Sequence, residues 1–191
     1  MSAPSLDSRA WYVMLIVAVA AERMFELWLS RRNLVRIGRR GGFVADRRSY
    51  LDMAAFQAAF LVACPVEVLA LDRPWIPALG VPALALVGAA MVLRYAAVAA
   101  LGDRWSLRLA VVPGERPVTS GPYRFVRHPN YLALAVETVA LPLVHTGWIA
   151  ACAFVPVFVP LLARRIRLEE AALARYSDYE RAFAGRGRLL P

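Results

Sequence analysis

Lysine is absent from this sequence, and cysteine and histidine are scarce. All 23 basic residues are arginine, and the chain has only two cysteines and two histidines. Cys64 and Cys152 both lie inside apolar runs, without the spacing of metal ligands or of a disulfide framework. His128 and His145 are too isolated to suggest a cluster of metal ligands. The sequence therefore predicts neither a metal site nor a disulfide-stapled fold.

Apolar residues, by contrast, make up 60% of the 191 residues. A soluble domain is nearer ~45–50% apolar, so this excess points to a bilayer as the solvent. The formal net charge is +9, but the arginines sit between apolar runs, which favours contact with membrane lipids over nucleic acid. The length suits a single domain over 1–191, with three N-terminal spans in 10–101 and a more polar half in 102–191.

Five apolar segments are the candidate spans. The first two have 19 residues each, which at ~1.5 Å per residue gives roughly 28 Å, close to a hydrocarbon core of ~30 Å. The last two are short and lie either side of 145–147, so we expect a helical hairpin, with one long kinked helix as the alternative. The fold class predicted is all-α and polytopic. The segments are 11–29, 53–71, 76–101, 131–144 and 148–163.

Arginine placement orients these spans. The segments 31–50, 102–128 and 163–191 together hold nineteen arginines, whereas the opposite side has only Arg9 and Arg73. Cytoplasmic loops carry the excess of basic residues. We therefore expect a multi-pass protein of the cell's inner membrane, with the N-terminus outside and the C-terminus in the cytoplasm.

Ionisable residues inside the spans are costly, at ~2.5–3.5 kcal/mol each, and need partners or a function. Arg23 and Glu26 are three residues apart on the first span and can pair. Arg94 and Glu137 lie at similar depth on the third and fourth spans. Two interpretations of Arg94 and Glu137 stay open: a salt bridge between helices, or a polar pocket for the head group of a substrate.

An ordered set of motifs fills the second half of the chain. It reads Gly121-Pro122-Tyr123-Arg124, Arg127-His128-Pro129-Asn130-Tyr131, the hairpin, Glu169-Glu170-x-x-Leu173, Tyr179 and a final Arg188-x-x-Pro191. In these residues the sequence resembles the isoprenylcysteine carboxyl methyltransferase family, over roughly 90–191. It departs from the family pattern at Leu132-Ala133, where many members have glycine, and near Ala182, where a second tyrosine is expected.

The resemblance implies S-adenosylmethionine as the cofactor and places it in the 102–191 half. Glu169 and Glu170 are expected to begin an amphipathic cytoplasmic helix; Glu170 is the expected cofactor ligand, and Glu169 would pair with Arg165 or Arg167. His128 would bind the cofactor or act as a general base. The implied cofactor-binding residues are Tyr123, Arg127, His128, Pro129, Tyr131, Glu169 and Glu170, and the catalytic candidates are His128, Arg94, Glu137 and Arg167.

The expected activity is O-methylation of a lipophilic carboxylate, enol or phenol. The substrate would enter laterally from the bilayer and the cofactor from the cytoplasm. Within the family, Arg94-Tyr95 and Glu137 resemble a bacterial branch, associated with type III polyketide synthases, that methylates alkylpyrone or phenolic lipids. Two alternatives stay open: a phospholipid N-methyltransferase, and a non-catalytic membrane accessory protein.

Overall fold

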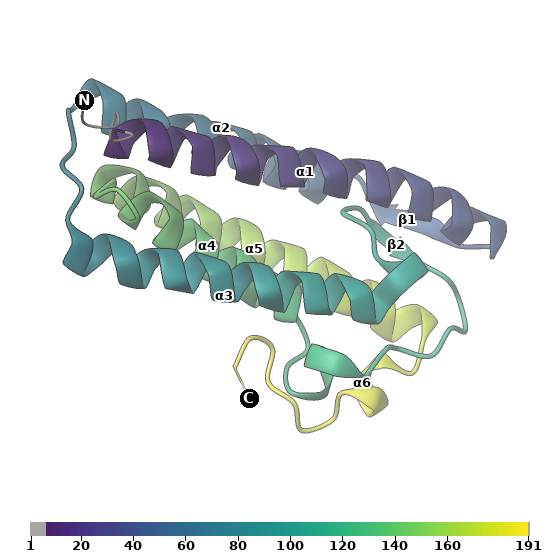
Figure 1. The fold of residues 1–191 in the computed structure, drawn as a ribbon. Coiled ribbons are helices and arrows are strands. Elements are labelled where there is room, and N and C mark those ends of the chain that lie inside the picture. Colours follow the sequence, from purple (N-terminus) through teal and green to yellow (C-terminus); the bar gives the residue numbers. More distant parts are fainter. Residues whose placement is uncertain (1–6, 191) are drawn as a thin grey trace.

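A computed structural model describes residues 7–190 as a bundle of long helices with short elements gathered at one end (Figure 1). The long helices run back and forth between this end and the opposite one, where the connections at 71–76 and 144–147 lie. The helices are α1 (Ser8–Arg39), α2 (Arg48–Ala70), α3 (Pro77–Leu101), α4 (Pro129–Leu143), α5 (Trp148–Tyr176) and α6 (Tyr179–Ala182).

Three of the described helices, α2, α3 and α5, are long and apolar enough by composition to cross a membrane. Helix α1 has 32 residues but carries Glu22, Arg23 and Glu26 in its middle, and α4 has only 15 residues. The prediction of a predominantly helical fold is therefore confirmed, with three helices that could span a membrane. That the chain has five spans, and that its C-terminus faces the cytoplasm, stay predictions.

The last two apolar segments form two separate helices that pack against each other, so the hairpin was predicted correctly and the single kinked helix was wrong. Helix α5 differs from expectation because it runs without a break to Tyr176. The prediction that a new helix begins at Glu169 was wrong. Residues 161–176 contain neither glycine nor proline, and they are mostly strong helix formers, so nothing ends the helix there.

A two-stranded antiparallel ribbon joins two loops at the arginine-rich end. Strand β1 (Phe43–Asp46) pairs with β2 (Leu109–Val111), with Phe43 opposite Val111. The expected all-α class missed this ribbon, because strands of four and three residues are too short to show an alternating pattern. The ribbon ties the loop after α1 to the loop before α4, and β2 lies against α5.

The core lies between the long helices, where α3 packs on α4 and α2 packs on α5. Phe56 and Phe60 of α2 pack against Phe154 and Phe158 of α5 with their rings edge-on or tilted. At the opposite end, Glu67 accepts hydrogen bonds from the backbone N–H groups of Ile149 (3.1 Å) and Ala150 (2.6 Å), which caps the start of α5. These contacts fix α5, and therefore the residues near its C-terminal end.

Candidate active site at the arginine-rich end

The Arg-His-Pro stretch lies at the start of α4. Pro129 occupies the first turn, where the missing N–H costs nothing, and His128 precedes it with a non-helical backbone (φ −129°, ψ 62°). The C-terminal tail runs alongside: the N–H groups of Arg127 and His128 donate to the carbonyls of Gly187 (3.0 Å) and Arg188 (2.9 Å). The tail therefore holds the His128 backbone from outside the bundle.

His128 belongs to a chain of polar contacts that runs to the tail. Its Nε2 lies 3.3 Å from Oε1 of Glu170, and Arg188 holds the same carboxylate through Nε (3.1 and 3.0 Å) and Nη2 (2.7 Å). The Tyr179 hydroxyl lies 3.4 Å from His128 Nε2, and the imidazole stacks on the Tyr131 ring. His128 is 4% exposed, so these neighbours fix its position.

Glu169 takes part in a second chain, across the helices. The Tyr131 hydroxyl donates to Glu169 and accepts a hydrogen bond from Arg165 Nε (3.0 Å). Arg165 also donates to Ser49 Oγ (2.7 Å) and to the Leu107 carbonyl (2.9 Å). Adjacent residues on a helix point about 100° apart, which is why neighbouring carboxylates serve different partners. The Arg127–Tyr131 stretch and the Glu169–Glu170 pair therefore meet through two separate contacts.

A cavity of about 170 Å³ opens between these groups and the preceding loop. Five residues predicted for cofactor binding line it: Tyr123, Arg127, His128, Tyr131 and Glu169. The other two, Pro129 and Glu170, are not in its wall. Helix α3, η1 (Gly102–Arg104), η2 (Gly121–Arg124) and the C-terminal segment complete the enclosure.

Several lining residues were absent from the predicted site. They come from the 104–118 loop, from α4, from α5 and from the segment after it, and they include Arg104, Trp105, Arg108, Asn130, Arg165, Tyr179 and Phe183. Asn130 and Tyr179 stand inside the sequence motifs, and Arg165 was expected to pair with Glu169, so the sequence carried a signal for these three. Arg108 and Phe183 carried none, because a loop arginine and a lone phenylalanine are common in any such chain. The final proline of the tail motif, Pro191, lies outside the described residues.

Two tyrosines of the wall lie outside the long helices, on η2 and α6. Burial raises the pKa of Tyr123 above its usual value, and the charge of Glu169 adds to the effect. Burial likewise raises the pKa of Tyr179, with further contributions from Glu169 and Glu170. Both phenols therefore stay protonated at neutral pH. They offer neutral hydroxyls and aromatic faces to a ligand, not phenolate bases.

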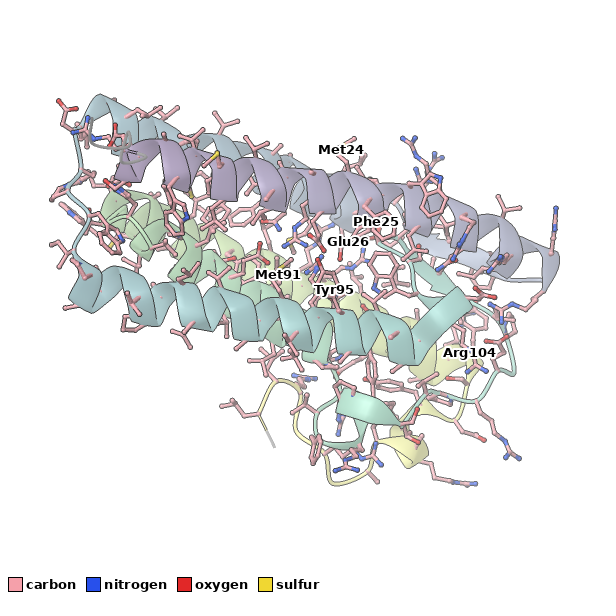
Figure 2. The ribbon with its side chains drawn as sticks, viewed as in Figure 1. Met24, Phe25, Glu26, Met91, Tyr95 and Arg104 are labelled. Atoms are coloured by element: carbon pink, nitrogen blue, oxygen red, sulfur yellow. The ribbon has the colours of Figure 1, made fainter. Side chains whose placement is uncertain are left out.

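Arg94 and Glu137 lie away from this cavity, in a buried ion network. Arg94 donates to Glu26 through Nε (2.6 Å) and Nη2 (2.5 Å), and Arg23 donates to both oxygens of Glu137. Arg23 also holds Glu22 (2.6 Å) and Glu26 (3.1 Å). Figure 2 shows Glu26 between α1 and α3. Arg94 and Glu137 thus pair with α1 and not with each other.

Arg167, the remaining catalytic candidate, is exposed on α5 and does not line the cavity. It lines an apolar groove on the outer side of α4 and α5, together with Arg188 and Leu189 of the tail. The four catalytic candidates are therefore divided among three places: His128 lines the cavity, Arg94 and Glu137 belong to the ion network, and Arg167 lines the groove.

Comparison with known proteins identifies the class. The model of the isoprenylcysteine carboxyl methyltransferase (ICMT) family matches residues 83–175, which include most of the cavity wall. Members of this family are membrane methyltransferases that use S-adenosylmethionine. The match runs from α3 almost to the end of α5 and so includes the Arg127–Tyr131 stretch and Glu169.

Two relatives extend the similarity along the chain. An uncharacterized protein of Bacillus subtilis (strain 168), YpbQ, is 30% identical over 168 residues, which cover 86% of this chain and 97% of the relative. An uncharacterized protein of Haemophilus influenzae (strain ATCC 51907 / DSM 11121 / KW20 / Rd) is 24% identical over 157 residues, 82% of this chain and 91% of the relative. The chain belongs to the isoprenylcysteine carboxyl methyltransferase family, and its class is that of the membrane methyltransferases.

Proposed function

We propose that this protein is an integral-membrane O-methyltransferase that uses S-adenosylmethionine and acts on a lipophilic acceptor. The observation that carries the proposal is the enclosure of one cavity by the Arg127–Tyr131 stretch and by Glu169. Methyl transfer from a sulfonium needs no metal and no covalent nucleophile on the protein, so binding, orientation and electrostatics are what the residues must supply.

The residues of the wall suit this cofactor. Asn130 lines the cavity, and its Oδ1 is buried without a hydrogen-bond partner within residues 7–190, so it offers an acceptor to a ligand. Glu169 offers a carboxylate to an ammonium group or ribose hydroxyls, and Arg127 offers a guanidinium to a carboxylate. Tyr123 and Tyr131 present aromatic rings, which attract a cationic sulfur. When bound, the cofactor supplies an electrophilic methyl group on that sulfur.

We assign the cofactor contact to Glu169 in place of Glu170, the residue favoured by the sequence. Glu169 lines the cavity, whereas Glu170 is held by Arg188 and lies beside His128. His128 lies in the wall with Nε2 directed to Glu170 and Tyr179, which fixes the orientation of the ring. For a hydroxyl acceptor His128 would take the proton; for a carboxylate already ionised near pH 7 it would only position the acceptor.

Oxygen is favoured over nitrogen as the methyl acceptor by the charges of the groove. Its charged lining residues are Arg167 and Arg188, which suit an anionic head group and repel an ammonium. A phospholipid amine would bring its own phosphate to these arginines, so identification of the methylated product decides between the two acceptors. The acceptor class that follows is a lipophilic carboxylate or acidic enol, entering from the bilayer, with the cavity on the cytoplasmic side where the arginines gather. Alkylpyrones stay one prediction within that class.

Binding of S-adenosylhomocysteine tests the proposal first. The purified full-length protein should be stabilised by the ligand, by about 2.7 kcal/mol at a concentration one hundred times Kd. Membranes incubated with methyl-labelled cofactor should then place the label in a lipophilic ester or enol ether and not in phospholipid. Absence of any thermal shift would favour the non-catalytic accessory protein, and labelled phospholipid would favour the N-methyltransferase.

A further inference from the structure

The outer side of α4 and α5 carries a groove that the cavity does not include. Its walls are apolar along their length, and among residues 7–190 two arginines are its only charged lining residues. The apolar lining is Ala135 and Val139 of α4, Val155, Phe158, Val159, Leu162, Ala163 and Ile166 of α5, and Leu189 of the tail. A surface with this composition, on the outer side of two helices, complements an extended hydrocarbon chain.

The charged lining residues are Arg167 and Arg188. Arg167 forms no ion pair with the described residues, whereas the guanidinium of Arg188 is bonded to Glu170, so an anion that binds Arg188 must compete with that carboxylate. Glu169, the other neighbouring carboxylate, accepts a hydrogen bond from Tyr131 and is not paired with Arg167. Arg167 is exposed, and the Arg188 side chain is 60% exposed although it is paired. Guanidinium groups bind carboxylate-like oxygens through paired hydrogen bonds. The groove therefore has an apolar trough and a cationic end.

The groove and the cavity share one chain of contacts. Arg188 lines the groove, His128 lines the cavity, and Glu170 lies between them, bonded to Arg188 and 3.3 Å from His128 Nε2. An anion that binds Arg188 competes with Glu170 for the same guanidinium. The carboxylate of Glu170 would then be less neutralised, and the potential beside the cavity would become more negative. A cationic ligand in the cavity gains from that change, while a neutral ligand does not.

We propose that the groove between α4 and α5 binds a single-chain amphiphile with an anionic head on Arg167 and Arg188. We propose further that its binding favours a cationic over a neutral ligand in the cavity, through Arg188, Glu170 and His128. Calling the amphiphile the methyl acceptor rests on the proposed function; the binding site itself does not. Because coupling between two sites is reciprocal, a cationic cavity ligand should also tighten binding in the groove.

Binding to the groove is tested with a pyrene-labelled fatty acid and the full chain in phosphatidylcholine nanodiscs. Arg167→Gln should weaken binding roughly tenfold, since it removes a charge-assisted contact. Ala163→Phe, which fills the groove one turn before Arg167, should weaken it as well. The matched controls are Arg175→Gln and Ala153→Phe, exposed positions of α5 outside the groove. Wild-type affinity in both test variants would overturn the proposal.

Nanodiscs of phosphatidylglycerol identify the occupant. If the groove takes one chain with an anionic head, the fatty acid should bind in these discs as it does in phosphatidylcholine discs. If phosphatidylglycerol displaces the fatty acid, a bilayer phospholipid is the occupant and the proposal is wrong.

The coupling is tested with two cavity ligands that differ in charge. S-adenosylhomocysteine has a neutral thioether, whereas sinefungin has a charged amine in place of the sulfonium. A saturating fatty acid should shift the ratio of their Kd values towards sinefungin by roughly fivefold. Arg188→Gln and Glu170→Gln, checked for wild-type melting temperature, should abolish the shift. An unchanged ratio in the wild-type protein would overturn the coupling.

The two sets of measurements separate the proposals. If neither nucleoside binds, the methyltransferase function fails, while the fatty-acid affinities of wild type and Arg167→Gln still decide whether the groove is a site. If both nucleosides bind and the fatty acid does not, the groove proposal fails and the function stands.

Discussion

Two polar regions of this protein contain the same residue types in opposite arrangements. In the network between α1, α3 and α4, Glu26 and Glu137 lie face to face with the guanidinium groups of Arg94 and Arg23. Arg94 is 3% and Glu137 2% exposed. At the cavity, arginines and carboxylates are spread around an opening, and they bond to tyrosines, histidine and backbone as often as to each other.

The difference shows how to distinguish buried charges that hold the helices together from buried charges that could bind a ligand. Charges that are paired across helices act as fixed connections, because removing one partner leaves a buried charge uncompensated. Unpartnered atoms do not separate the two regions: Asn130 Oδ1 at the cavity has no hydrogen-bond partner among the described residues, and neither do Arg23 Nε and Arg94 Nη1 in the network. What separates them is that Glu169 and His128 line a cavity, whereas Arg94 and Glu137 do not. We therefore expect Arg94 and Glu137 to connect helices, and Glu169 and His128 to act in the site.

The largest expected effect is the loss of a network arginine. Arg94→Ala leaves Glu26 without its bidentate partner inside the bundle, so unfolding free energy should fall by about 3–5 kcal/mol. Thermal unfolding of the purified protein in detergent measures it. A normal melting temperature combined with lost methyl transfer would instead place Arg94 in the site, as one interpretation of the sequence allowed.

At His128 we expect the opposite result, a loss of methyl transfer without a loss of stability. His128→Ala should lower methyl transfer by roughly 10²–10⁴-fold if the imidazole moves a proton, with a melting temperature close to wild type. Labelled-methyl incorporation and thermal unfolding, measured on the same preparation, give both quantities. Arg175→Gln, on the exposed side of α5, serves as the control with wild-type turnover. Full activity in His128→Ala would remove this residue from the site.

The adjacent carboxylates sharpen the comparison within the site. Glu169→Gln should weaken S-adenosylhomocysteine binding by roughly 1.5–3 kcal/mol, because a charged acceptor in the wall is lost. Glu170→Gln should affect that affinity less and should loosen the tail held by Arg188. Calorimetry gives the affinities and limited proteolysis of the tail gives the second readout. The opposite order of the two affinities would restore the sequence-based preference for Glu170.

A smaller effect is expected where α2 begins. Asp46 accepts hydrogen bonds from the N–H groups of Arg48 (3.2 Å) and Ser49 (2.9 Å). The Ser49 side chain first, and then these backbone groups, lower the pKa of Asp46. The pKa of Asp46 in the folded state is therefore below its value in the unfolded chain, which is near ~3.9. This difference stabilises the fold at pH values above ~3.9, and the stabilisation is lost as the pH falls through the folded-state pKa. Asp46→Ala should cost about 1 kcal/mol at pH 7 and less in acid. Asp178→Ala, which removes no cap hydrogen bond, is the control.

The smallest effect belongs to exposed ion pairs at the same end. Arg36 and Asp103 form a pair with both side chains about half exposed. Such pairs contribute ~0–1 kcal/mol and are screened by salt. Arg36→Gln should leave both unfolding and turnover within error of wild type. A drop as large as that of Arg94→Ala would mean that burial does not distinguish the two kinds of pair.

Much of this molecule was readable from local pattern. Apolar runs of span length predicted the helices to within a few residues at most ends, and Pro129 after His128 marked the start of α4. The motif order also brought Tyr123, Arg127, Tyr131 and Glu169 into one predicted set, and all four line one cavity. Such patterns can be read from the sequence because hydrophobic periodicity, helix capping and helix-breaking residues all act within one or two helical turns.

Other features depend on partners far along the chain. The β1–β2 ribbon joins residues more than sixty positions apart, and no signal in three or four residues specifies it. The same holds for Arg94, whose partner lies on α1 and not on α4, and for the choice between Glu169 and Glu170, which depends on where Tyr131 and Arg188 lie.

The sequence by itself indicated a bilayer as the solvent, the class of membrane methyltransferases and the residue types expected in the site. It could do so because hydrophobic runs and motif order are properties of the chain alone. The tertiary structure decided which charges neutralise one another and which face an open cavity. The reason is geometric: adjacent carboxylates on a helix diverge by about 100°, and only the packing of α4, α5 and the C-terminal tail determines what each of them meets.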